Sequence, residues 1–273
     1  MSNLGRKLLD KPYALWAVLF VLAPLCMVVY YAFTDTGGTF SLHSVSQIPS
    51  YLSTILLSVL YGLAATVICL LLGYPFAYLI SKHAARRQRT VVLLVMLPMW
   101  MNFLIRTYSW MTILGDSGVI NSVLTAVGLE PAKLINTGGA VILGMVYNFL
   151  PYMILPIYSV LSKLDGSLIE AAEDLGSSRH QVFRRVVLPM SLPGVLSGIT
   201  MVFVPAISTF IISKMLGGGT NQLIGDIIEL QFLGNSYNPN LGSAISLVLM
   251  VVVLLCMSIM SNFDDEEMEG RIL

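Results

Sequence analysis

Six long apolar runs, separated by shorter polar connections, dominate the pattern of the chain. They occupy residues 12–33, 52–80, 90–114, 138–161, 192–215 and 241–262. A transmembrane helix needs roughly 20 mostly apolar residues, so each run is long enough to cross a bilayer. No Gly/Ser-rich linker or internal repeat divides the runs. The pattern therefore predicts an all-α integral membrane protein with six transmembrane helices in one membrane domain.

The first run raises the question of a signal peptide, because Arg6, Lys7 and Lys11 precede it. A cleavable signal has an apolar stretch of about 7–15 residues followed by a small-residue cleavage site. The run at residues 12–33 is longer than this, and no such site follows it. We therefore expect a retained first helix, with Pro12 tolerated in its first turn.

Basic residues gather on one side of the predicted spans. They occur in the N-terminal segment and in the connections after the second and fourth runs: Arg6, Lys7, Lys11, Lys82, Arg86, Arg87, Arg89, Lys163, Arg179, Arg184 and Arg185. The opposite connections hold only Lys133 and, at a span end, Lys214. Because cytoplasmic loops are enriched in Lys and Arg, we expect residues 1–11 to form a cytosolic N-terminus and residues 263–273 an acidic cytosolic tail.

Composition narrows the class of protein further. Of the 273 residues, 56% are hydrophobic and 11% are charged, whereas soluble domains carry about 25% charged residues. The formal net charge is zero, which gives no overall attraction to nucleic acid. The three cysteines all lie in apolar runs and are too few for a disulfide framework. These values exclude a soluble enzyme, a nucleic-acid-binding protein and a disulfide scaffold.

Two connections on the predicted outer side have mixed patterns. In residues 116–128 the apolar positions fall near one helical face, which predicts a short helix against the outer mouth. Residues 221–232 have a similar pattern, and we expect them to dip back into the protein.

The predicted cytosolic connection at residues 163–189 carries more local signals than any other. Ser167 with Glu170 and Ser178 with Gln181 both have the spacing of a capping box. Gly176 stands between them, where a helix C-cap belongs. The segment therefore predicts two short helices joined by a tight turn. Periodicity alone leaves two interpretations open: a loop packed on its own bundle, or a docking surface for a partner.

A spaced motif in this segment favours the docking interpretation. It comprises Glu170, Ala171, Ala172, Gly176, Val186, Leu188 and Pro189. This pattern resembles the EAA motif of ABC importer permeases, with Val186 where the family has Ile. The resemblance covers residues 52–262, the five-helix core, and implies the six-helix type I permease fold, with residues 12–33 as its first transmembrane helix. In that family the EAA loop forms coupling helices that dock on the ATPase subunit. Residues 163–189 are therefore called the coupling segment.

Shorter motifs point to one branch of the family. They are Leu72-Gly-Tyr-Pro-Phe-Ala-Tyr78, Leu97-Pro-Met-Trp100 with Ile105-Arg-Thr-Tyr108, Leu150-Pro-Tyr152 with Leu155-Pro156, and Met215-Leu-Gly-Gly218. In order and spacing they resemble the spermidine/putrescine permeases. Related branches that carry ferric iron, sulfate or molybdate remain alternatives for the substrate.

The resemblance implies a set of partners and a location. It implies an ABC ATPase dimer that uses ATP and Mg, a second homologous permease, an extracytoplasmic substrate-binding protein and membrane lipid, with no nucleic acid. It also implies a multi-pass protein in the cytoplasmic (inner) membrane of a bacterium. An ion-coupled secondary transporter is a weaker alternative, because the spans carry few ionisable groups and no inverted repeat.

Chemistry-bearing patterns are missing from the sequence. It contains no phosphate-binding loop, His-Glu-x-x-His pattern or Gly-x-Ser-x-Gly elbow. His83 and His180 stand beside basic residues in cytosolic connections, which favours solvated surface over metal binding. We therefore expect no catalytic residue, no metal site and no cofactor on this chain, so an intramembrane enzyme is disfavoured.

Candidate residues for a translocation path follow from two arguments. Ionisable groups within spans are costly and often functional, which marks Arg106, with Asn102 one turn away, as a lining or gating residue. The ammonium groups of a polyamine interact with carboxylates and aromatic faces, which adds the acidic and aromatic candidates. The candidates are Trp100, Asn102, Arg106, Tyr108, Trp110, Asp116 and Glu229. Each has a plainer interpretation. Arg106 can snorkel to an interface, the aromatic side chains can form an interfacial belt, and the two acids can be solvated surface. Prolines within the runs, such as Pro98 and Pro205, predict kinks and leave a gating role open.

Overall fold

The computed structural model describes residues 15–35, 37–234 and 236–269, with side chains described up to residue 259. The predicted cytosolic N-terminus at residues 1–11 and the end of the tail at residues 270–273 lie outside this part. The chain divides into two units. One contains the described residues of Met1–Ile55 together with Ile227–Leu254, and the other contains Leu56–Asp226 together with the described residues of Leu255–Leu273.

The first unit is built from the N-terminal helical stretch and the start of the last helix. Its elements are the π turn η1 (Val18–Leu22), α2 (Ala23–Ala32), α3 (His43–Ser46), the 3-10 turn η2 (Ile48–Tyr51), most of α13 (Ile224–Leu233) and the first part of α14 (Pro239–Glu269). The Asn240 side-chain amide donates to Tyr31 O at 3.0 Å and to Thr34 O at 2.6 Å. These two bonds tie the start of α14 to the end of α2.

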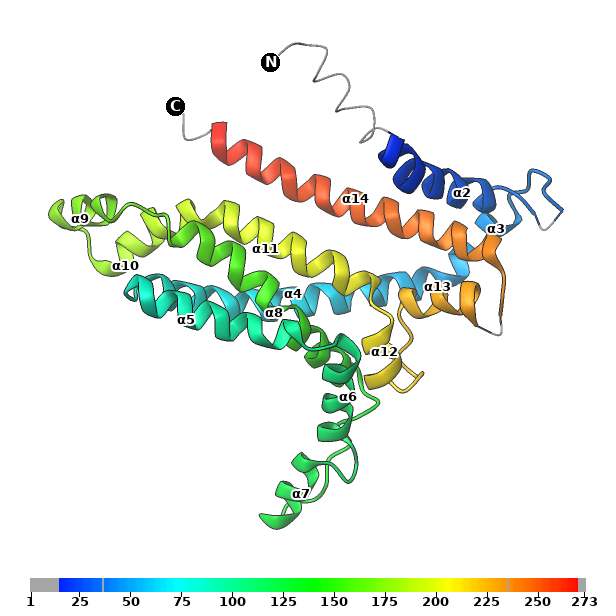
Figure 1. The fold of residues 1–273 in the computed structure, drawn as a ribbon, viewed down its shortest axis with the longest axis horizontal. Coiled ribbons are helices and arrows are strands. Elements are labelled where there is room, and N and C mark those ends of the chain that lie inside the picture. The colour runs from blue at the N-terminus through cyan, green and yellow to red at the C-terminus, as the bar shows by residue number, and fades with distance from the viewer. Residues whose placement is uncertain (1–14, 36, 235, 270–273) are drawn as a thin grey trace. The chain divides into compact units, whose positions relative to one another are not determined.

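The second unit is helical and holds most of the predicted spans (Figure 1). Its elements are α4 (Leu52–Ser81), α5 (Ala85–Met96), the 3-10 turn η3 (Leu97–Trp100), α6 (Phe103–Leu114), α7 (Val119–Ala126), α8 (Gly138–Leu161), α9 (Gly166–Asp174), α10 (Arg179–Val182), the π turn η4 (Phe183–Val187), α11 (Leu188–Ser208), α12 (Ile211–Leu216) and the start of α13 (Ile224–Leu233). The first residues of α4 belong to the other unit.

The close packing of α8 against α11 forms the centre of the second unit. A Cβ atom added at Gly194 would lie 2.9 Å from Pro156 O and 3.1 Å from Ile157 Cα. Only glycine permits this backbone approach, and small residues play the same part at many membrane helix interfaces. Met153 and Val202, from the two helices, are fully buried in the resulting core.

The hydropathy pattern located most spans correctly. Among the described residues, five helical stretches are long and apolar enough to cross a membrane: Leu15–Ala32, Ile48–Ser81, Gly138–Leu161, Arg179–Ser208 and Pro239–Ile259. The predicted run at 138–161 coincides with α8. The predicted short helix within 116–128 is α7, and the segment 221–232 forms most of α13, which begins with buried residues.

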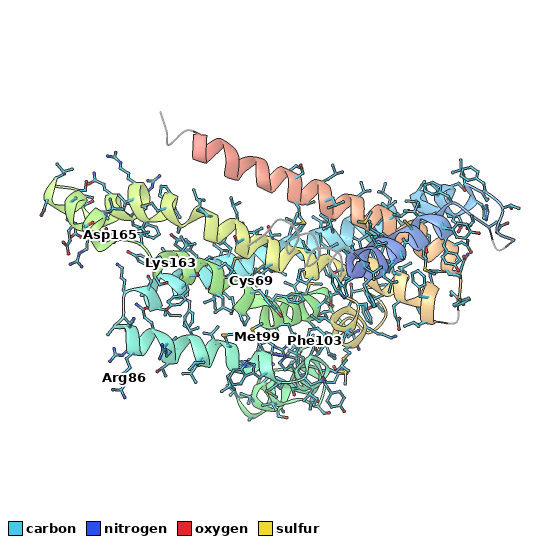
Figure 2. All side chains as sticks on the ribbon, turned by 45° about the horizontal axis from the view of Figure 1, so that its top comes forward. Cys69, Arg86, Met99, Phe103, Lys163 and Asp165 are labelled. Atoms are coloured by element: carbon cyan, nitrogen blue, oxygen red, sulfur yellow. The ribbon has the colours of Figure 1, made fainter. Side chains whose placement is uncertain are left out.

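The third predicted span, at 90–114, is wrong as one continuous helix. The structure has two helical pieces, Ala85–Trp100 and Phe103–Ala126, bent by 88° at a short break. Met101 and Asn102 both have extended backbone angles, with ψ of 149° and 133°. Asn102 Oδ1 then accepts a hydrogen bond from the Leu104 N–H at 2.8 Å, which starts α6 as a new helix. Met99 and Phe103 stand on the two sides of this break (Figure 2).

The fifth and sixth predicted spans also differ from the structure at their ends. Instead of running through 192–215, α11 ends at Ser208, because Thr209 is extended, with φ −66° and ψ 141°. A separate helix, α12, follows. The last helix, α14, continues to Glu269, beyond the predicted end at residue 262. The first part of the acidic tail is therefore helical.

Among the described residues there are two π turns, and one residue separates the end of each from a proline. The Ala23 N–H donates to Val18 O before Pro24, and the Leu188 N–H donates to Phe183 O before Pro189. Proline has no N–H, and its ring clashes with the carbonyl four residues earlier in an α-helix. A wider turn moves that carbonyl away, so the helix passes the proline without ending.

Candidate functional site

The coupling segment begins with an N-cap that differs from the predicted one. Asp165 Oδ1 accepts a hydrogen bond from the Ser167 N–H at 3.0 Å, so Asp165 caps α9. The predicted capping box of Ser167 with Glu170 is therefore wrong by two residues. This backbone hydrogen bond lowers the pKa of the exposed Asp165 carboxyl below its usual value.

The turn after α9 is a Schellman motif centred on Gly176. The Gly176 N–H donates to Glu173 O at 2.9 Å, and the Ser177 N–H donates to Ala172 O at 3.1 Å. Gly176 has φ +82°, a left-handed conformation that favours glycine. The predicted tight turn between two short helices is confirmed.

The second short helix, α10, has the predicted capping box. Ser178 Oγ accepts from the Gln181 N–H at 3.4 Å, and Gln181 Oε1 accepts from the Ser178 N–H at 2.8 Å. The π turn η4 then joins α10 to α11 without a break. Val182, directly before Phe183 in the sequence, and Val187, four residues after it, are both buried in the core. This part of the segment is therefore packed against the second unit.

The outward surface of α9 is mixed in character. Ile169 and Ala172 pack against the core of the second unit. Leu175, three residues after Ala172, is by contrast 87% exposed. The other exposed residues of α9 and its turn are Gly166, Ser167, Leu168, Glu170, Ala171, Glu173, Asp174 and Gly176. The EAA residues therefore include Glu170, Ala171 and Gly176 at the surface and Ala172 against the protein.

Phe183 makes an aromatic contact with α4 that sequence reasoning missed. Its ring lies edge-on to Tyr78, with centroids 5.2 Å apart, and to Tyr74, with centroids 6.0 Å apart. The Lys82 ammonium lies 4.2 Å from the centre of the Tyr78 ring, and the Tyr74 hydroxyl is 2.8 Å from Ser191 Oγ. The π turn of the coupling segment thus contacts the end of α4 directly.

A second contact joins the ends of three helices next to the coupling segment. The Gln88 side-chain amide donates to Ser81 O at 2.9 Å and to His83 O at 2.7 Å. Its Oε1 accepts from the Tyr158 hydroxyl at 3.0 Å. Figure 2 places Arg86 of α5 at the same end of the second unit as Lys163 and Asp165.

The structure gives the predicted path residues of α6 separate environments. Asn102 is the N-cap of α6. Arg106 is 8% exposed, and its Nε and Nη1 atoms have no hydrogen-bond partner among the described residues. This burial disagrees with snorkelling. Trp110 packs edge-on to Tyr147 at 5.3 Å between ring centroids, beside an apolar pocket of about 630 Å³.

The remaining path candidates lie nearer to solvent. Trp100 is 74% exposed and Tyr108 is 57% exposed, as expected for interfacial aromatic side chains. Asp116 is exposed and Glu229 is half-buried.

A buried acid near Glu229 has a structural role that sequence reasoning missed. Asp226 Oδ2 accepts from the Leu223 N–H at 2.7 Å, and Ser58 Oγ accepts from the Ile224 N–H at 2.7 Å. Together these two side chains cap the start of α13. Within the described part of the chain, no three His, Cys, Asp or Glu side chains are grouped so as to hold a metal ion.

Comparisons with known proteins agree on the kind of molecule. The chain is 40% identical over 250 residues to the spermidine/putrescine transport system permease PotB of Haemophilus influenzae, covering 88% of this chain and 87% of the relative. It is 37% identical over 248 residues to PotB of Escherichia coli, covering 87% and 90%. A chain of a bacterial ABC transporter that imports the acidic polysaccharide alginate shares the fold, with a TM-score of 0.78, 18% identity and coverage of 97% and 96%.

The family comparison covers the larger part of the sequence. Residues 73–265 match the binding-protein-dependent transport system inner membrane component family. These residues contain the coupling segment, α8 and α11, and all of the last predicted span. The helical fold, the candidate membrane spans and the EAA pattern all agree with this match. The chain therefore belongs to the family of inner membrane components of binding-protein-dependent transport systems.

Proposed function

We propose that the chain is the permease subunit of an ATP-driven polyamine importer, with spermidine or putrescine as its substrate. The coupling segment is the observation that carries the proposal. Two capped helices, joined by the Gly176 turn, present Glu170, Ala171 and Leu175 outward. The same segment is fixed to α4 through Phe183. Such a unit can receive movement from a docked partner and pass it to a membrane helix.

The proposed assembly follows the partners that the EAA resemblance implies. An ABC ATPase dimer docks on α9 and α10 and supplies the energy from ATP and Mg, so this chain is a non-catalytic translocation subunit that needs no cofactor. A second homologous permease completes the pore, and an extracytoplasmic binding protein delivers the substrate. Both termini are cytosolic, on the side of the coupling segment and its basic residues.

Substrate class rests on two lines of support. The curated relatives at 37–40% identity are named spermidine/putrescine permeases. The chain also supplies the aromatic and acidic side chains that ammonium groups prefer, including Trp100, Tyr108, Asp116 and Glu229. For the substrate, the alternative is a permease for ferric iron, sulfate or molybdate. For the energy source, an ion-coupled transporter is a weaker alternative, because it would have no ATPase to dock on α9 and α10.

Reconstitution tests the proposal directly. The chain is purified with its ATPase, its second permease and its binding protein, and placed in proteoliposomes. Uptake of radiolabelled spermidine, putrescine, ferric iron, sulfate and molybdate is then measured with and without ATP. ATP-dependent uptake of a polyamine alone is the expected result. Uptake of an anion or of iron in its place would overturn the substrate, and uptake without ATP would overturn the mechanism.

A further inference from the structure

A pocket of about 560 Å³ lies in the first unit, between the end of α2 and the start of α14. Its lining combines three tyrosines, one aspartate and small polar residues: Tyr30, Tyr31, Thr34, Asp35, Gly38, Tyr237, Asn238, Pro239 and Asn240. None of the residues named for the translocation path contributes to it.

The chemistry of this pocket suits a cation. Asp35 supplies a carboxylate, and the three tyrosines supply aromatic faces that attract ammonium groups. Lysine and arginine are absent from the lining. The pocket also lies at the C-terminal end of α2, where the helix dipole adds partial negative charge.

The start of α14 does not favour an anion, although it is a helix N-terminus. Pro239 has no backbone N–H to offer. The Leu241 N–H donates to Asn238 Oδ1 at 3.2 Å, and the Gly242 N–H donates to Asn238 O at 3.0 Å. Asn240 already uses its side-chain amide on the carbonyls of Tyr31 and Thr34. Most donors that would hold an anion are therefore engaged.

We propose that this pocket binds a primary alkylammonium group, held by the Asp35 carboxylate and the faces of Tyr30 and Tyr237. If the N-terminus is cytosolic, α2 ends on the outer side, where substrate arrives. The source of the ammonium group rests on the proposed function: one end of a polyamine, bound near the outer surface. A lysine of the binding protein carries the same group and is the other source.

The test measures ligand binding to the assembled transporter in lipid nanodiscs without the binding protein, and, in a separate titration, docking of the binding protein on the same nanodiscs. The probes are n-butylammonium and spermidine, followed by saturation-transfer NMR. Asp35→Asn removes the charge and keeps the shape, so we expect both probes to bind about tenfold more weakly, as loss of one charge-assisted bond predicts. Replacing both Tyr30 and Tyr237 by leucine should weaken binding similarly. Glu130→Gln, an exposed acid outside the pocket, is the matched control and should bind as wild type.

The outcomes separate this site from the proposed function. The site is overturned if Asp35→Asn binds both probes as wild type does and also leaves docking of the binding protein unchanged. This conclusion holds whether or not the transporter imports polyamine. Weaker butylammonium binding in a transporter that imports no polyamine supports the site and overturns the proposed function. Weaker docking of the binding protein, with spermidine binding unchanged, supports an ammonium site whose source is a lysine.

Discussion

The ring of Phe183, in the π turn of the coupling segment, lies edge-on to the ring of Tyr78 in α4, with centroids 5.2 Å apart. This contact joins the surface proposed for the ATPase to a helix that is long and apolar enough to cross the membrane. Force applied to α9 and α10 therefore has a direct route into α4. Aromatic pairs of this kind contribute about 0.5–1.5 kcal/mol each.

Phe183→Leu should lower transport relative to ATP hydrolysis, because leucine keeps apolar volume but loses both edge-on contacts. We expect uptake per ATP hydrolysed to fall several-fold in proteoliposomes while the ATPase remains bound. Phe76→Leu is the matched control, since Phe76 lies on α4 between Tyr74 and Tyr78 and is 40% exposed. An unchanged ratio in Phe183→Leu would show that this contact does not carry the coupling.

Gly176→Val should uncouple hydrolysis from transport by breaking the turn between α9 and α10. A β-branched residue in the left-handed region costs about 1–2 kcal/mol or more. Gly128 has nearly the same backbone angle, φ +84°, and likewise has open space around its added Cβ. Gly128→Val therefore introduces the same strain outside the coupling segment and should leave the uptake-to-hydrolysis ratio intact. Equal loss in both variants would point to general strain.

Substitution of Asn102 can distinguish a helix cap from a path residue. Serine is a good N-cap, so Asn102→Ser should keep both the start of α6 and the rate of uptake. Asn102→Ala should lose about 1 kcal/mol of stability, measured by thermal unfolding of the purified complex. If Asn102→Ser lost uptake at unchanged stability, the amide itself would be needed in the path.

Neutralising the outer acids tests the proposed polyamine path. Asp116→Asn and Glu229→Gln should each lower polyamine uptake about tenfold, as expected for loss of one charge-assisted contact, without lowering membrane abundance. Glu130→Gln serves as the control for charge on the predicted outer side. Normal uptake in both variants would remove these acids from the path.

The start of α9 should be insensitive to pH near neutrality. The folded pKa of Asp165 is lowered by its backbone hydrogen bond. Its stabilising effect is thus complete above the unfolded value of about 3.9 and is lost only as pH falls through the lower folded pKa. Hydrogen exchange of α9 amides, corrected for intrinsic rates, should stay constant from about pH 8 to pH 5.5. Asp165→Ala should exchange faster throughout that range, and Asp165→Asn should not.

The sequence predicted the spans well because hydropathy averages over a whole helix. Hydropathy failed to predict the helix ends at Met101 and Thr209, where the backbone angles of one or two residues end a helix within an apolar run. The cap of α9 was misplaced because Asp165 and Ser167 are both good caps. The Phe183 contact could not be predicted, since residues about 105–109 positions apart meet only after α4 and α11 are placed.

The turn at Phe183–Val187 also changes the phase of the helix that contains it. A π turn holds one more residue than an α turn, and each residue advances an α-helix by about 100°. If the α-helical periodicity of α11 is extended backward through the π turn, each residue of α10 is therefore placed about a quarter turn away from its actual position around the helix axis. A turn that already holds this extra residue can tighten or migrate while the chain stays helical. In the proposed assembly, such a shift of the π turn would rotate the helix that meets the ATPase about its own axis without unfolding it.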